Sequence, residues 1–521
     1  MVRETIRIAN TVSSFGEVVA GSDKELALLN ILRGFVEDHS DSIYLDPVPV
    51  TSWHEDYCVI EIDGDTYRCA IQPPIQTNLD EEVAKSSIIA MNAEQAVKRS
   101  FTERSLQNKV VVVETPRDPD DIATIARALG EHEPSLIIFS DNLNTIRRIV
   151  VLSNLIAAYD RSSPVKTPVI VVPSYVAKKI IESDKARILA KSATRESYGY
   201  NFIAKSYGSG DREIYIVAHH DHWLSGASDN VLGVALATTL FKNMTSLNSV
   251  KRGLALALFT AEEGFPQRLS SFYWLVGSRH FVSKNFYRLF EEVEAVINID
   301  VVYSNDVRVS TSSPILRSAI VNDGLNLDVV NDNIIFDSFS FSVVGIPSAT
   351  INSFHKALES GIYHSDLDVV SNVSVDAIQK FAEITINVIR AVSRDRSLDL
   401  SIVENVLASE IGGDPPSLEV LESLYHFFTE LKKCGAMQKR LYLKTFERLA
   451  LKSYVGMYIR ERLGVREFTR ILMCKDGVYS VPLGTIENVN GCHINYRFNI
   501  DLLRYIIRGA CKSQVDSYAS K

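Results

Sequence analysis

The sequence predicts an α/β fold with a mixed, mostly parallel sheet and helices on both of its faces. Three observations lead to this prediction. Short apolar runs that look like buried strands alternate with amphipathic helical segments from about residue 190 to residue 398. A second, self-contained set of strands and helices occupies about residues 75–188. Apolar residues at helical spacing mark the start of residues 417–521.

The composition is that of a globular protein. A chain of 521 residues is too long for one ordinary core and predicts two to four domains. The formal net charge of −9 argues against a nucleic-acid partner and against a polybasic membrane anchor. No apolar run reaches the ~18 residues that a membrane span needs, and charges interrupt the N-terminal stretch where a signal peptide is apolar. We therefore expect a cytoplasmic protein without a membrane partner.

The elements can be followed in order along the chain. Ser22 and Asp23 can cap a helix within the first 45 residues. Strand-like alternation runs from about residue 44 to residue 71. Further on, an amphipathic helix at 120–129 lies among three apolar runs that predict strands, at 108–114, 135–139 and 168–172. We expect a discontinuous domain of residues 1–75 and 189–398, a small α/β or β-rich insertion at 76–188, and a mostly helical C-terminal domain at 399–521 with a linker at 412–416.

One hairpin is predicted in detail. Asp63-Gly64 is typical of a two-residue turn between antiparallel strands. In that register Cys58 lies directly opposite Cys69, at a separation that a disulfide can span. For an intracellular chain we expect two reduced cysteines, an expectation that a hyperthermophile source would change.

Histidines and acids follow the predicted strands of the 190–398 region. The carboxyl ends of parallel strands meet in one crevice of an open α/β sheet, so side chains at these ends converge. Imidazoles and carboxylates gathered there need cations to neutralise them, and a set of nitrogen and oxygen ligands suits zinc. The residues in question are His219 to His222 after strand 214–218, Asp229 at a helix start, Glu262 and Glu263 after strand 254–259, Asp300 after strand 295–299, and Tyr363 and His364 in the loop after strand 346–351.

As an ordered series, these residues resemble a known family. His-x-Asp, Gly-Ala-Ser-Asp-Asn, Glu-Glu, Asn-x-Asp and Tyr-His follow one another as in the co-catalytic dizinc aminopeptidases, whose relatives include glutamate carboxypeptidase, the non-enzymatic transferrin receptor and the glutaminyl cyclases. The resemblance covers about residues 1–75 and 190–398 and implies a fold of the zinc exopeptidase type. The insertion resembles, less sharply, a protease-associated domain. Together they imply an enzyme that hydrolyses the N-terminal peptide bond of a peptide.

The resemblance also implies the metal ligands. His219 and Asp300 would hold one zinc ion, Glu263 and His364 would hold a second, and Asp229 would bridge the two. Another divalent ion, such as Co²⁺ or Mn²⁺, could take the place of zinc.

Three further residues would carry the chemistry in this scheme. Glu262, which has no metal of its own, would be the general base that takes a proton from the metal-activated water. Tyr363 would donate a hydrogen bond to the developing oxyanion. Asp221, two residues after His219, would orient His219 or Asp229 from behind.

Some choices among neighbouring residues stay open in the sequence. His219 is preferred to His220 and His222 because it fits the His-x-Asp spacing and because alternation turns His220 to the opposite side of the sheet. His355 is an alternative to His364 as the last ligand. The loop from 264 to 276, rich in aromatic residues, could form a wall of the substrate pocket.

Alternative functions on the same scaffold also stay open. These are a glutaminyl cyclase-like acyltransferase with one zinc ion, a carboxypeptidase or dipeptidase, and a non-enzymatic receptor-like scaffold. The expected partners are peptide substrates, and the apolar helical stripes of the C-terminal domain suggest either a homodimer through that domain or a lid. The sequence indicates neither the side-chain preference nor the metal used in the cell.

Overall fold

The structure is a computed structural model of the chain. It describes residues 1–393 except for 101–105, 120, 153–162, 209, 211, 247–251, 270–272, 312, 331 and 334. It also describes residues 418–435, 438–439, 441–445, 469–474, 477–482, 492–494, 504 and 507. The expected linker at 412–416 lies outside the described residues.

A large mixed sheet forms the centre of the molecule. Within the described residues it has eleven strands, in the order β12-β1-β9-β11-β10-β13-β16-β14-β15, with β2 paired to β1 and β4 paired to β9. Its middle is parallel, because β11, β10, β13 and β16 all run in the same direction. The predicted α/β class is therefore confirmed. These middle strands are β10 (Glu213–His219), β11 (Gly253–Phe259), β13 (Val293–Ile299) and β16 (Ser348–Asn352); the others are β1 (Ser42–Ile62), β2 (Asp65–Arg68), β4 (Thr77–Ala84), β9 (Lys185–Ser206), β12 (Phe265–Pro266), β14 (Arg308–Ser310) and β15 (Asp328–Val330).

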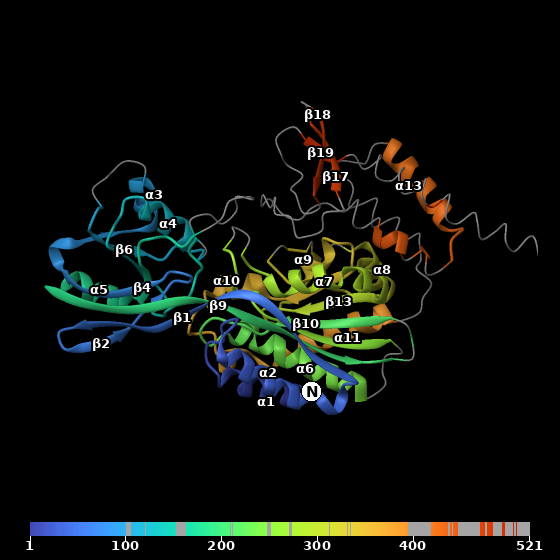
Figure 1. The fold of residues 1–521 in the computed structure, drawn as a ribbon, viewed down its shortest axis with the longest axis horizontal. Helices are drawn as coiled ribbons and strands as arrows, with labels where there is room; N and C mark the ends of the chain where they lie inside the picture. The colour runs from blue at the N-terminus through green and yellow to red at the C-terminus, as the bar shows by residue number, and fades with distance from the viewer. Residues whose placement is uncertain are drawn as a thin grey trace, which may run out of the picture.

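Helices cover both faces of this sheet (Figure 1). On β10, Ile214 and Ile216 face one core while Tyr215 and Val217 face the other, as expected for a strand buried on both sides. The first core is closed by α1 (Val2–Ser13), α2 (Asp23–Val36), α6 (Leu232–Ser246), α8 (Pro314–Asn322) and α11 (Val375–Ser393). The second is closed by α7 (Val276–Glu292) and α9 (Ser338–Ser342). The shorter elements are α10 (Phe354–Ser360), the π-helical turn η3 (Ala227–Val231), and the 3₁₀ turns η1 (Glu37–His39), η2 (Lys85–Ser87) and η4 (Val370–Asn372).

The insertion folds around a second sheet. Its five strands, counted within the described residues, lie in the order β3-β8-β7-β6-β5, and all neighbours except β3 and β8 are parallel. The strands β6 (Val110–Glu114), β7 (Leu136–Asp141) and β8 (Val169–Pro173) and the helix α4 (Asp121–Gly130) match the predicted runs. The remaining elements are β3 (Ala70–Ile71), β5 (Ile88–Met91), α3 (Ala93–Ser100) and α5 (Ser174–Glu182). Strands β1 and β9, of 21 and 22 residues, pair along their lengths and run through both domains (Figure 1).

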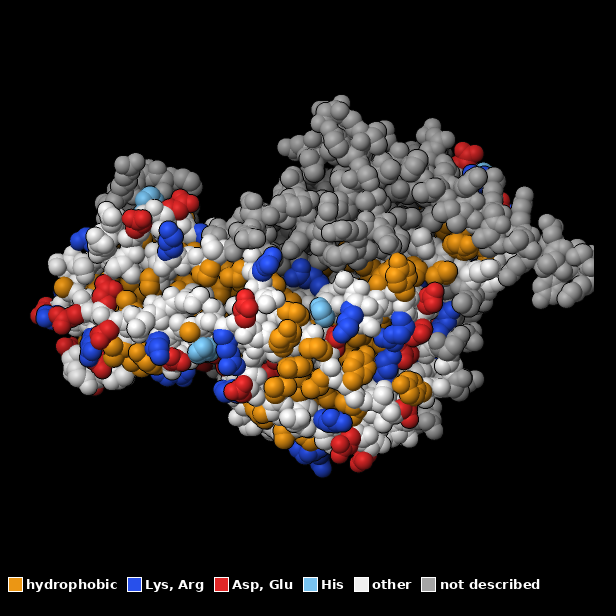
Figure 2. Space-filling model, in the orientation of Figure 1, with side chains coloured by type: hydrophobic (Ala, Val, Ile, Leu, Met, Phe, Trp, Pro, Cys, Tyr) orange, Lys and Arg blue, Asp and Glu red, His pale blue; other side chains and the backbone are white. Residues whose placement is uncertain are grey.

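The surfaces of the two domains differ on the face shown in Figure 2. Hydrophobic side chains gather there on the larger domain, whereas acidic and basic side chains lie close to one another on the smaller one. None of the helices among the described residues is both long and apolar enough to cross a membrane.

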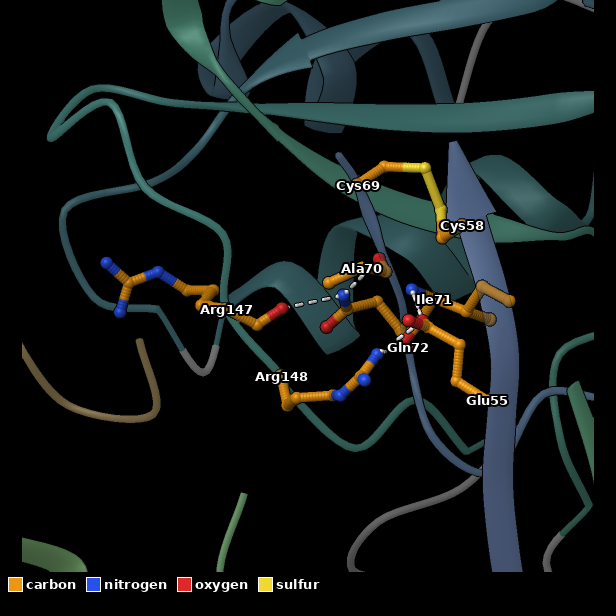
Figure 3. Close-up of a disulfide and its surroundings, with 8 residues drawn as sticks. All are labelled: Glu55, Cys58, Cys69, Ala70, Ile71, Gln72, Arg147 and Arg148. Carbon is orange, nitrogen blue, oxygen red and sulfur yellow. Dashed lines mark hydrogen bonds and ion pairs between the residues drawn. A yellow bond between two sulfur atoms is a disulfide. The ribbon is translucent and has the colours of Figure 1, made fainter. Parts of the chain in front are cut away.

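The predicted hairpin forms, but its cysteines differ from the expectation. Asp63 and Gly64 both have positive φ, and Ile62 pairs with Asp65, as the Asp-Gly turn requires. Cys58 and Cys69 are joined by a disulfide with a Cα–Cα distance of 5.0 Å (Figure 3). The expectation of a reduced pair is therefore wrong: the hairpin register brings the two buried side chains face to face. Disulfides of this kind are typical of oxidising compartments and of hyperthermophile proteins.

The C-terminal region holds both helix and strand. Helix α13 (Leu418–Leu431) buries apolar side chains, among them Phe427 and Leu431. Lys444, also in this region, donates hydrogen bonds to the carbonyl oxygens of Phe290 (2.7 Å) and Val293 (2.6 Å). A three-stranded antiparallel sheet of β17 (Thr469–Cys474), β18 (Gly477–Pro482) and β19 (Cys492–Ile494) accompanies the helix, and the sequence did not predict it.

Candidate active site

The carboxyl edge of the parallel strands gathers the predicted site residues. His219 is the last residue of β10, and Asp300 follows directly after β13. Glu262 and Glu263 lie in the loop after β11, and His364 lies in the loop after α10. Asp229 stands in the turn η3 that opens α6. Segments far apart in the sequence thus meet at one edge of the sheet, as the strand-end argument predicts.

Among the described residues, two groups of side chains have ligand atoms close enough to hold a metal ion. One group is His219, Asp229 and Asp300, and the other is Asp229, Glu263 and His364. His219 Nε2 lies 3.2 Å from Asp229 Oδ1 and 3.4 Å from Asp300 Oδ1. His364 Nε2 lies 2.6 Å from Glu263 Oε1 and 3.5 Å from Asp229 Oδ2. Asp229 therefore directs one carboxylate oxygen toward each group, and all five side chains are buried.

The crowded charges shift the pKa values of these groups. Burial alone would lower the pKa of His219, but the carboxylates of Glu262 and Asp300 raise it well above its ordinary value. Burial also opposes ionisation of Asp229, but hydrogen bonds with His219 and His364 bring its pKa below the ordinary value. For His364, burial is outweighed by Glu263 and Asp229, and the pKa rises to about 10. In the absence of metal these contacts favour the protonated imidazoles, and a bound metal ion would take the place of these protons.

The donor set fits divalent metal ions. Three carboxylates and two imidazoles in a buried space need compensating positive charge, and the same nitrogen and oxygen donors suit zinc. Each imidazole has its other nitrogen engaged, since His219 Nδ1 lies 2.9 Å from Asp221 O and His364 Nδ1 lies 3.1 Å from Arg148 O. This arrangement leaves Nε2 of both rings toward the carboxylates, as is common for metal-binding histidines.

Glu262 and Asp221 lie beside the two groups without being part of them. Burial is the main cause that raises the pKa of Glu262 well above its ordinary value. The Asp221 carboxylate accepts hydrogen bonds from the backbone N–H groups of Glu262 (3.0 Å) and Glu263 (3.1 Å). Burial raises the pKa of Asp221 to about 6. Asp221 thus contacts His219 through its backbone oxygen, while its carboxylate holds the Glu262-Glu263 loop, a contact that the sequence did not predict.

Tyr363 lies against the His364 ring. The two rings are stacked with centroids 3.7 Å apart, and Phe354 meets Tyr363 edge-on at 5.3 Å. Tyr363 also lines the pocket that contains the two groups of ligands.

Two outer partners of the ligands were not assigned a role from the sequence. Trp223 donates a hydrogen bond from Nε1 to Glu263 Oε2 (3.0 Å). Asp368 accepts from the backbone N–H groups of Ser228 (2.8 Å) and Asp229 (3.3 Å) and so fixes the bridging residue. The family resemblance offered a signal for Asp368, because an aspartate commonly follows the Tyr-His pair, whereas nothing in the sequence pointed to Trp223.

The alternative histidines lie elsewhere. His220 Nε2 is 2.9 Å from Glu25 Oε1, on the face of the sheet opposite His219. His222 bonds backbone oxygens, and burial lowers its pKa to about 4. His355 faces Asp306, with Nε2 3.3 Å from Oδ2. None of the three belongs to either group found among the described residues.

A pocket of about 270 Å³ opens onto the ligands. Tyr273 and Trp274, from the loop that was expected to form a wall, line it together with Ile335, Phe336 and Phe354. The insertion also lines it, through residues of α4 and of the segment that follows β7: Asp121, Ala123, Thr124, Arg127, Ile149 and Val150.

Comparison with known proteins agrees with this geometry. Residues 201–389 match peptidase family M28. The fold is similar to that of the zinc aminopeptidase of Bacillus subtilis (TM-score 0.58, 14% identity, covering 76% of this chain and 95% of that one). It is also similar to a peptidase M28 precursor from Shewanella amazonensis (TM-score 0.59, 17% identity, 76% and 94%) and to an aminopeptidase from Aneurinibacillus sp. strain AM-1 (TM-score 0.51, 16% identity, 76% and 95%).

The search of curated proteins found no match. The family profile covers His219, Asp229, Glu263, Asp300 and His364, so all five residues of the two ligand groups lie within the matched segment. The family resemblance predicted from the sequence is confirmed, since residues 201–389 of this chain match peptidase family M28.

Proposed function

We propose that this chain is a two-metal aminopeptidase that hydrolyses the N-terminal peptide bond of peptides. The observation that carries the proposal is the position of Asp229, with one oxygen toward each of two ligand groups. The family match supports metal-dependent peptidase activity. The zinc aminopeptidase of Bacillus subtilis, which has a similar fold, supports zinc as the metal.

In this proposal Glu262, Tyr363 and the carboxylates of the site have separate roles in the reaction. When bound, two ions would lower the pKa of a shared water and polarise the scissile carbonyl. Glu262, buried at the pocket but outside both ligand groups, takes the proton of the attacking water and passes it to the leaving amine. Tyr363 stabilises the negative charge that develops on the carbonyl oxygen. The surrounding carboxylates attract the free α-amine of the substrate, which favours aminopeptidase action.

Two ligand groups favour this function over its rivals. A glutaminyl cyclase-like enzyme with one zinc ion needs only one of the two groups. A receptor-like scaffold has no use for a complete ligand set or for a buried carboxylate at Glu262. A homodimer through the C-terminal domain and an intracellular location stay predictions.

Metal content and substrate profile test the proposal together. Protein loaded with zinc and dialysed should hold about two ions per chain by elemental analysis. It should cleave aminoacyl-nitroanilides and lose this activity toward the same compounds with an acetylated amine. A fully active protein that holds only about one zinc ion per chain would favour the glutaminyl cyclase-like alternative. Preferential release of C-terminal residues from peptides with a blocked amine would favour a carboxypeptidase.

A further inference from the structure

The loop that carries His364 has an unfavourable backbone conformation. His364 has φ of 56°, in the left-handed region that residues with a Cβ rarely adopt. Such a conformation persists only where the surroundings hold it in place. The contacts that hold it come from the inserted domain.

Residues 145–149 of the insertion, here called the clamp segment, lie antiparallel to residues 364–366. The backbone N–H of Arg148 donates to His364 O (2.9 Å), and the N–H of Asp366 donates to Ile146 O (3.0 Å). Arg147 forms a β-bridge with Ser365 between these two bonds. The His364 ring bonds back to the same segment, with Nδ1 3.1 Å from Arg148 O. Both the backbone and the imidazole of this ligand are thus set by the insertion.

The side chain of Arg147 strengthens the same contact. It is almost fully buried, and its Nε lies 2.7 Å from Asp141 Oδ2 at the end of β7. Its two terminal nitrogens donate to the carbonyl oxygens of Tyr363 (2.5 Å) and Gly361 (3.0 Å). One guanidinium therefore ties the sheet of the insertion to the backbone on the N-terminal side of His364. An arginine is suited to this role because its planar fork offers several donors in fixed directions.

The clamp segment is itself held by residues of both domains. Arg148 pairs with Glu17 (2.9 Å) and Glu55 (2.6 Å) and donates to Ile71 O (2.7 Å). Gln72 donates to Arg147 O (2.9 Å) and accepts from the N–H of Ile149 (2.6 Å). Figure 3 shows Gln72, Arg147 and Arg148 near the disulfide. The segment has little freedom to move away from His364.

We propose that Arg147 is a positioning residue through which the inserted domain completes the metal site of Glu263 and His364. This inference rests on the proposed two-metal function. Among the described residues no such link reaches the His219 and Asp300 side, whose ligands stand at the ends of β10 and β13 of the large sheet. Loss of the arginine should therefore weaken one metal site and spare the other.

The test measures the affinity of each site separately. A His219→Ala variant retains the Glu263 and His364 side, and a His364→Ala variant retains the His219 and Asp300 side. Arg147→Met is added to each, and the zinc affinity is measured by competition with a chromophoric chelator. We expect Arg147→Met to weaken zinc binding about 10–100-fold in the His219→Ala protein, the usual effect of losing an outer-shell partner. In the His364→Ala protein it should change the affinity less than about twofold.

Two further variants separate positioning from general loss of stability. Arg147→Lys, which can replace one of the lost hydrogen bonds, should recover part of the affinity. Arg212→Met removes a half-buried ion pair, with Glu294 (3.1 Å), beside the first residue of β10 at the opposite edge of the sheet. It should leave zinc binding unchanged. If Arg147→Met does not fold, Asp141→Asn replaces it in the test. This variant weakens the ion pair with Arg147 while keeping a side chain of the same size.

The outcomes are distinct. Equal zinc affinity with and without Arg147 in a folded His219→Ala protein, or equal losses in both backgrounds, would overturn the inference while leaving the proposed function intact. A parent protein that binds no zinc would instead contradict the proposed function, and this inference with it.

Discussion

Glu262 and Glu263 are neighbours in the chain, yet their surroundings give them different chemistry. Glu263 has one oxygen 2.6 Å from His364 Nε2 and the other 3.0 Å from Trp223 Nε1. Glu262 is buried without belonging to either ligand group of the described residues, and burial raises its pKa. A carboxylate with a raised pKa close to the metal groups is suited to accept and return a proton. The Asp221 carboxylate accepts hydrogen bonds from the backbone N–H groups of both residues and so holds the loop that carries them.

Replacing Glu262 by glutamine should separate catalysis from metal binding. We expect Glu262→Gln to lower kcat by about 10²–10⁴-fold, the usual contribution of a general base. Zinc content should stay the same, because the side chain is not a ligand in this scheme. Steady-state kinetics with an aminoacyl-nitroanilide and elemental analysis measure the two effects. Glu196→Gln, at an exposed position, is the control. Full activity of Glu262→Gln would exclude this residue as the base.

Asp332 should make stability depend on pH. Burial raises its pKa to about 7, while Ser338 and Ser342 donate to its carboxylate. Between about pH 4 and pH 7 the folded protein keeps a proton that the unfolded chain releases, so the free energy of unfolding falls as the pH rises through this window, by roughly 4 kcal/mol at most. Asp332→Asn removes this titration.

Urea unfolding at several pH values tests this prediction. The loss of stability between pH 5 and pH 8 should be smaller in Asp332→Asn than in the parent. Other titrating groups contribute equally to both proteins, so their effects cancel when the two are compared. A hydrogen bond lost in the variant lowers its free energy of unfolding by the same amount at each pH and does not change the pH dependence. Parallel pH dependences of the two proteins would show that Asp332 is not the group responsible.

His219, Glu263 and Asp300 could be placed from the sequence because they follow predicted strands, whereas the full ligand set was implied by the family resemblance. An apolar run followed by His219 or Asp300 gives both the residue and its place in the fold. Trp223, Arg147 and Arg148 could not be found in this way. Arg147 and Arg148 reach the site through contacts between domains, and Trp223 reaches it through a contact within the larger domain; no local periodicity encodes such contacts. Asp221 lies beside His219 as expected, but the hydrogen bonds from the Glu262 and Glu263 backbone to its carboxylate could not be read from a two-residue spacing.

At the scale of elements, helix α7 sets the position of the Glu262 loop. The backbone N–H groups of Leu275, Val276 and Gly277 donate to the carbonyl oxygens of Glu262, Ala261 and Thr260, at 2.9–3.1 Å. A Cβ on Gly277 would lie 2.2 Å from Thr260 O, closer than any real contact allows. The close approach of helix and loop therefore requires glycine at this position.

We expect Gly277→Ala to lower the free energy of unfolding by about 1–3 kcal/mol or more, and to lower kcat because the Glu262 loop must shift. Chemical unfolding and steady-state kinetics would measure both changes. Gly34→Ala in α2 is a matched control, since a Cβ there meets no atom within 4 Å. It should be neutral or stabilise by up to ~1 kcal/mol. A Gly277→Ala protein as stable and active as the parent would contradict the packing described above.

Elements with strong local signals were predicted well. Ser22 caps α2 by accepting from the N–H of Glu25 (3.2 Å), and the Asp63-Gly64 turn has the expected register. The C-terminal sheet of β17, β18 and β19 was missed, because the helical stripes that precede it dominated the pattern. The prediction that Cys58 and Cys69 are reduced came from the expected cellular compartment, which the geometry of a hairpin does not reveal.

At the scale of the whole molecule, the metal site should contribute to stability. Ligands that bind the folded state alone stabilise it by mass action, by about 4 kcal/mol per site at a thousandfold excess over Kd. Removal of metal with a chelator should therefore lower Tm, and added zinc should restore it. The shift should be smaller in His364→Ala, which keeps one ligand group. Scanning calorimetry measures this, and a Tm that does not respond to zinc would contradict binding at these groups.

Strands β1 and β9 join the two domains as a continuous antiparallel ribbon. At about 3.3 Å per residue, such strands reach roughly 70 Å. The ribbon departs from regular pairing between Glu55 and Tyr57. Two long paired strands resist bending, so we expect that the inserted domain does not open and close over the pocket as a hinged lid. Peptides would then enter a pocket whose opening keeps nearly the same width. The small motion that remains would be a twist of the two strands near the irregularity between Glu55 and Tyr57.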